Sequence, residues 1–167
     1  MAPHLIFFIP RQFDVEAILP ELTQSLELPA YVGPRNAEAE FQFVASRGAG
    51  EDSYLLIEYS ADAHKMIEEL SKWEKPSKTY KELLLACKSK IGIHYRDSKN
   101  GIKAILKIGA LLGEAAEGCI VDNDYGCLLK LSNMVNCIHE NPGWSWERGE
   151  FPDLVGVAAS EWREDEG

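Results

Sequence analysis

The stretch GCIVDNDYGCLLKL, Gly118 to Leu131, decides the fold that we predict for this chain. It holds two short β-rich runs, CIVDND and GCLLKL, which meet at a cluster of Asp, Asn and Gly residues. These residue types accept turn conformations and hydrogen-bond to their own backbone, so the stretch predicts a β-hairpin. Ser132 follows in the position of a helix cap, ahead of the apolar run NMVNCIHE.

The same cluster has residue types that occur in calcium loops. An EF-hand loop needs oxygen ligands at positions 1, 3 and 5, glycine at position 6 and a carboxylate at position 12. Counting from Asp122 puts Gly126 at position 5, Cys127 at position 6 and Asn133 at position 12. The spacing therefore fails, and we predict no metal and no other cofactor. Cys119 and Cys127 can face each other across the hairpin, where small apolar packing is favoured over a disulfide in a reducing compartment.

The elements on either side of the hairpin repeat in a fixed order. Ahead of it, KIGIHYRD predicts a strand with Ile91, Ile93 and Tyr95 on one face, and residues 98–118 predict one long helix. The first part of the chain has the same order, because HLIFF is followed by a helical pattern, by the hairpin of EFQFVAS and SYLLIEYS, and by a helix in ADAHKMIEELSKW. Each half therefore reads β-α-β-β-α.

This order predicts an α+β fold, with a largely antiparallel sheet and helices packed on one face. We expect a single domain, 1–167, with two tandem units at 1–75 and 88–140. A bridging helix at about 79–88 joins the units, and an irregular aromatic and acidic segment at 141–167 completes the chain.

The charge of the chain excludes some partners. The net charge is -10, and the acids are concentrated at the two ends, whereas residues 76–131 hold 9 bases against 6 acids. Affinity for nucleic acid needs clustered Lys and Arg, so nucleic acid is not the expected partner. The longest apolar run, HLIFFIP, is too short for a membrane span and lacks the flanks of a signal peptide. We therefore expect a soluble, cytoplasmic protein.

No catalytic motif appears along the chain. The four histidines, His4, His64, His94 and His139, are scattered over different elements, without HExxH or paired metal spacing. Nucleotide, hydrolytic and phosphoryl-transfer motifs are absent as well. The sequence accordingly predicts a protein that is not an enzyme.

The C-terminal segment is the candidate binding surface. Three of the four tryptophans lie in it, interleaved with carboxylates. Tryptophan supplies interface anchors, and carboxylates attract a basic partner, although tryptophans that only cover a core would give the same pattern. The predicted surface, with the hairpin aspartates added, consists of Trp144, Trp146, Glu147, Glu150, Glu161, Trp162, Asp122 and Asp124.

The chain resembles the immunity proteins that are encoded beside bacterial polymorphic toxins, including those delivered by type VI secretion. The resemblance covers the overall plan, the run from YKELLLAC to GCIVDNDYG, and the PGWSW stretch. It implies binding of one cognate, cytoplasm-acting toxin. If that toxin is a nuclease with a basic cleft, an acidic inhibitor can place carboxylates where phosphates would bind.

Two alternatives belong to other functional classes. One is an enzyme or small-ligand domain with a site built from His94, Arg96, Asp122 and Asp124 at neighbouring strand ends. The other is a subunit of a larger assembly, which a symmetric apolar patch would signal, and a homo-oligomer is one such assembly.

Overall fold

The computed structural model describes residues 4–12, 21, 30–33, 41–45, 55–95, 98–123 and 128–141. The strands in these ranges are β1 (His4–Ile9), β2 (Ala30–Gly33), β3 (Phe41–Ala45), β4 (Leu55–Ser60), β5 (Ser89–Tyr95), β6 (Ile120–Asn123) and β7 (Leu128–Lys130). The helices are α2 (His64–Glu74), α3 (Lys78–Leu85), α4 (Ser98–Leu112), the 3-10 helix η2 (Gly113–Gly118) and α5 (Leu131–Glu140).

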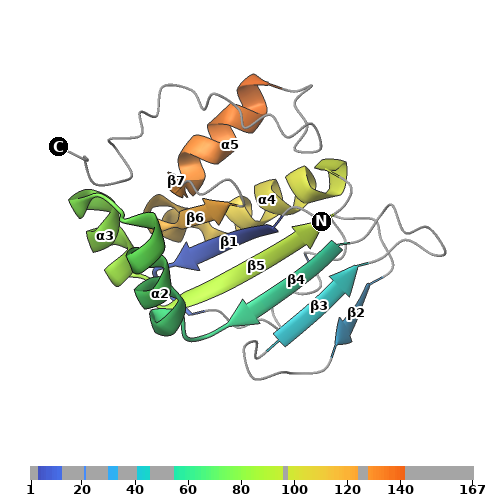
Figure 1. Ribbon diagram of the computed structural model, residues 1–167. Helices are drawn as coiled ribbons and strands as arrows, with labels where there is room; N and C mark the ends of the chain where they lie inside the picture. The colour runs from blue at the N-terminus through green and yellow to red at the C-terminus, as the bar shows by residue number, and fades with distance from the viewer. Residues whose placement is uncertain are drawn as a thin grey trace.

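The strands of the described residues form one sheet in the order β2-β3-β4-β5-β1-β6-β7. Every neighbouring pair is antiparallel. Figure 1 shows β5 and β1 in the middle of this sheet, with helices beside it. The α+β class and the antiparallel sheet are therefore confirmed, and both predicted hairpins, β3–β4 and β6–β7, are present.

The two predicted β-α-β-β-α units share this sheet and are interleaved in it. β4, from the first unit, pairs with β5, the first strand of the second unit. β1, the first strand of the chain, lies between β5 and β6. Because each hairpin borders the first strand of the other unit, neither unit has a sheet of its own.

Helices cover both faces of the sheet, and the expectation of helices on one face was wrong. β1 gives the physical reason, because successive residues of a strand point to opposite faces. Phe7 is buried beneath α4 and α5 on one face, whereas Phe8 is buried among residues of α2 and α3 on the other. A strand that is apolar on both sides needs cover on both sides.

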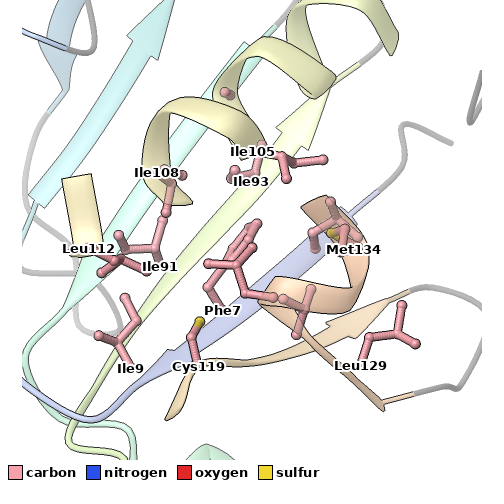
Figure 2. Close-up of a cluster of buried hydrophobic side chains, with 14 of the residues drawn as sticks. Phe7, Ile9, Ile91, Ile93, Ile105, Ile108, Leu112, Cys119, Leu129 and Met134 are labelled. Carbon is pink, nitrogen blue, oxygen red and sulfur yellow. The ribbon is translucent and has the colours of Figure 1, made fainter. Parts of the chain in front are cut away.

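The face beneath α4 and α5 holds the larger core. In Figure 2, Ile105 and Ile108 of α4 project toward Ile91 and Ile93 of β5, with Phe7 beside them. All of these side chains are at most 5% exposed. Burying one such side chain stabilises the fold by roughly 1.5–3 kcal/mol, so this cluster makes the main contribution to stability.

The helix predicted over residues 98–118 is shorter than expected. α4 ends at Leu112, and the chain continues as η2. Gly113 has a φ of 56°, a left-handed conformation that ends an α-helix and favours glycine. The apolar pattern concealed this break, because Ala115 and Ala116 of η2 are partly buried against the core and continue the apolar pattern of α4.

Candidate interaction surface

Most of the predicted binding surface lies outside the described residues. This applies to Trp144, Trp146, Glu147, Glu150, Glu161, Trp162 and Asp124. Asp122 is the member of the set that the structure describes, and it lies on β6 opposite Ile6 of β1 and Leu128 of β7. Its side chain is half-buried, and its Oδ1 atom has almost no contact with solvent. Asp122 is thus part of the sheet surface and not an exposed charge at a rim.

The strand register brings together part of the alternative site. Glu58, Gly92, Ile6 and Asp122 are successive partners across β4, β5, β1 and β6, so their side chains share one face of the sheet. His94 lies on the same face, two residues along β5 from Gly92. Arg96 and Asp124 lie outside the described residues. Sequence reasoning missed Glu58, although its alternation with the apolar Ile57 and Tyr59 gives its face.

The register spreads these polar residues over several strands. Neighbouring strands are about 4.8 Å apart, so the backbones at Glu58 and Asp122 are separated by roughly 14 Å. His94 and Asp122 are two strands apart and also offset along the sheet. The described members of the alternative site therefore share one face of the sheet but lie on different strands.

The cysteines of the described residues have the properties of packing groups. Cys87, Cys119 and Cys137 are buried and unpaired with one another. Burial raises the pKa of the Cys87 thiol to about 12 and raises the pKa of the Cys119 and Cys137 thiols as well. A protonated thiol is a poor nucleophile and a poor metal ligand. Cys127, and with it the cross-hairpin pair with Cys119, lies outside the described residues.

Within the described ranges, no three His, Cys, Asp or Glu residues are grouped so that they could hold a metal ion. The same ranges contain no helix with both the length and the apolar character needed to cross a bilayer.

Two large apolar side chains of the described residues are exposed, Trp73 at 85% and Leu85 at 66%. Trp73 lies in the last turn of α2, and Leu85 is the last residue of α3. The two helices pack against each other and cover Phe8, Ile120 and Leu128 on the second face of the sheet. Figure 1 shows them together at the end of the sheet where β1 finishes.

Local sequence signals fix the orientation of these two helices. Ahead of α2, the Asp62 carboxylate accepts a hydrogen bond of 2.9 Å from the backbone N–H of His64. In α3, the Ser77 hydroxyl accepts the backbone N–H of Tyr80 at 3.4 Å and so caps the helix. Tyr80 and Leu84 then point inward, which leaves Leu85 on the outer side. The Lys130 ammonium lies 5.9 Å from the centre of the Tyr80 ring and adds a cation–π contact from β7.

The helical period places Trp73 at the edge of the inward side of α2. Ile67 and Leu70 are buried, and the spacing i, i+3, i+7 extends this inward side to position 74. Met66 is half-buried and lies seven residues before Trp73, so the two residues lie on nearly the same side of the helix. The helical period alone therefore does not predict that Trp73 is exposed.

Lysines are frequent in the segment that carries the two exposed apolar side chains. We define the α2–α3 surface as Trp73 and Leu85 together with the exposed lysines of the same segment, which are Lys72, Lys75, Lys78, Lys81 and Lys88. Between residues 72 and 88 these five lysines face two acids, Glu74 and Glu82. This part of an acidic chain is therefore locally basic.

Comparison of the chain with known protein families, with curated proteins and with solved structures found no match.

Proposed function

We propose that this chain is a binding protein, and specifically an immunity protein that neutralises a cognate, cytoplasm-acting toxin. The observation that carries the proposal is the acidity of the chain, whose net charge is -10, because a strongly acidic protein is complementary to a basic partner protein. Support also comes from the buried thiols of the described residues, because burial raises their pKa and a protonated thiol is not an activated nucleophile.

The charge of the chain supports a basic toxin as the partner. A net charge of -10 attracts a positively charged protein at long range and raises the association rate. Residues 132–167 hold eight acids against two bases, so we expect this attraction to be strongest at that part of the chain. Nucleic acid and membranes are not the proposed partners, because both are anionic.

Coexpression with the product of the neighbouring gene tests this function. If that product is a toxin, cells that make it should survive only when this chain is made as well, and the two proteins should copurify. The association rate, measured by stopped-flow fluorescence, should fall steeply with added salt. Survival that does not depend on this chain would contradict the proposal.

Variants of the C-terminal segment locate the contact. Trp146→Ala, or charge reversal at Glu147 and Glu150, should weaken binding of the toxin without unfolding the chain. Glu114→Lys with Glu117→Lys is the matched control, because these exposed residues of η2 give the same change in net charge. Equal binding by both charge-reversed proteins would remove the C-terminal segment from the proposal.

A further inference from the structure

Three consecutive residues at the end of α2 are unfavourable choices for the stability of the fold. Trp73 faces water, whereas the next residue, at position 74, is half-buried. This position holds Glu74, and burial raises the pKa of its carboxyl group. Lys75 follows with a φ of 46°, a left-handed conformation for which glycine is preferred. A chain with residues 73 and 74 exchanged, and with glycine in place of Lys75, would form a more stable end of α2.

Residues that break local rules in this way are expected at functional positions, where another requirement outweighs stability. At residues 73–75 the result is an exposed indole with lysines on both sides, Lys72 and Lys75. Lys78 and Lys81 continue the basic surface along α3 toward Leu85. An apolar anchor surrounded by positive charge is complementary to an apolar pocket or side chain surrounded by carboxylates.

We propose that the α2–α3 surface is a docking site for an acidic segment of a partner protein, with Trp73 as its central anchor. This site consists of other residues than the acidic C-terminal segment, and its charge is of the opposite sign. The proposal therefore goes beyond the proposed function and does not depend on the partner being a toxin.

The charge distribution favours a protein segment over a longer polyanion. At physiological salt the Debye length is about 8 Å, so charges near the contact dominate. Glu68 and Glu69 are exposed on α2, within about one turn of Trp73. DNA or an anionic bilayer extends past the lysines and would meet these acids. A short acidic segment can approach Trp73 from the side of Lys75 and Lys78, which follow it in the chain, whereas Glu68 and Glu69 precede it.

Selection from a random peptide library displayed on phage tests the proposal with the full chain as bait. We expect the selected peptides to be rich in Asp and Glu and to contain an aromatic or aliphatic residue. Affinities of labelled synthetic copies, measured by fluorescence anisotropy, should fall about tenfold or more for Trp73→Ala. The double change Lys72→Glu with Lys78→Glu should weaken binding by about tenfold, because it reverses two charges at the contact.

The matched control is Lys103→Glu with Lys107→Glu on α4, which gives the same net charge on the opposite face of the sheet. It should leave the affinity within about twofold, since these charges lie beyond the screening distance. Circular dichroism and urea midpoints, unchanged for Trp73→Ala, separate loss of binding from loss of folding.

Several results would overturn the proposal. Selected peptides without enrichment in acids, or peptides that bind Trp73→Ala as well as the original chain, would remove the site. Tighter Trp73-dependent binding to a DNA duplex, or to vesicles that contain phosphatidylserine, would assign the surface to a different class of partner. Self-association that Trp73→Ala abolishes, detected by analytical ultracentrifugation, would assign it to a second copy of the chain.

Discussion

The two helical layers of this molecule cover the same sheet but differ in where their apolar residues go. On one face, α4 directs Ile105, Ile108 and Leu112 into the core, and all three are nearly or fully buried. On the other face, α2 and α3 bury Ile67, Leu70 and Leu84 but leave Trp73 and Leu85 in water. The first layer follows what stability alone requires, whereas the second layer does not.

This difference separates the residues that hold the fold from those available for binding. The layer of α2 and α3 needs its inner residues to cover Phe8, Ile120 and Leu128. Its outer residues make no comparable contribution, because their apolar surface stays hydrated. Neighbouring residues of one helix should therefore respond in opposite ways to substitution, and this contrast can be measured.

Leu84 and Leu85 provide the sharpest contrast between the inner and outer sides. Leu84 is 0% exposed and Leu85 is 66% exposed. Leu84→Ala should lower the free energy of unfolding by about 2–5 kcal/mol, because it leaves a cavity beneath α3. Leu85→Ala should change it by less than about 0.5 kcal/mol. Urea unfolding of both variants checks this, and equal losses would show that both sides of α3 are structural.

Gly101 and Gly109 give a matching pair in the layer of α4. A Cβ atom at Gly101 would lie 2.6 Å from Cδ2 of Tyr95, a ring that is fully buried and cannot move aside easily. Gly101→Ala should therefore cost about 1–3 kcal/mol through overpacking. A Cβ atom at Gly109 would meet Val135 Cγ2 at an ordinary 3.5 Å. Gly109→Ala should stabilise the helix by up to about 1 kcal/mol. Thermal unfolding that shifts both variants in the same direction would contradict this assignment.

Local periodicity predicted the elements of this fold better than their arrangement. The hairpins, β5 and the inward side of α2 follow from residue alternation and helical spacing, which are local properties. The placement of β1 between β5 and β6 depends on contacts between distant residues, and no local pattern specifies it. Coverage of both faces could have been predicted, because LIFFI is apolar at every position and not only at alternate ones.

The residues of the candidate site were predicted less completely than the elements of the fold. The interleaved tryptophans and acids predict a binding surface in the C-terminal segment, which lies outside the described residues. That predicted surface does not include the fourth tryptophan, Trp73. Trp73 lies near the end of α2, far along the chain from the other three tryptophans. Its exposure does not follow from the helical period, because Met66 and Leu70 lie seven and three residues before it and pack against the core.

Lys75 tests whether the end of α2 sacrifices stability. Lys75→Gly should raise the free energy of unfolding by about 0.5–1 kcal/mol, because glycine adopts the left-handed conformation without strain. Lys72→Gly is the matched control within the helix and should lower stability by about 1 kcal/mol. Chemical unfolding gives both values. A destabilised Lys75→Gly variant would mean that the Lys75 side chain itself supports the fold.

Glu74 gives the smallest expected effect and tests the same segment through pH. Burial raises the pKa of Glu74 in the folded state, because it disfavours the charged carboxylate. The protonated carboxyl group therefore contributes stability that is fully present below the unfolded pKa. This contribution is lost as pH rises through the folded pKa. Glu74→Gln should therefore stabilise the chain at pH 7 by less than about 1 kcal/mol, since the group is only half-buried and water screens part of its charge. The gain should disappear at about pH 3, where the carboxyl group is protonated in both states.

Glu69→Gln is the control for this measurement, because Glu69 is exposed on the same helix and its replacement removes an equal charge. Urea unfolding of both variants at the two pH values isolates the effect of burial from that of net charge. A gain for Glu74→Gln that persists at low pH, or an equal gain for Glu69→Gln, would mean that the carboxylate at position 74 is not held inward. In that case the exposed Trp73 would no longer be matched by a buried carboxylate at position 74. The role of the α2–α3 surface would then be decided by the binding measurements on the Trp73 variant.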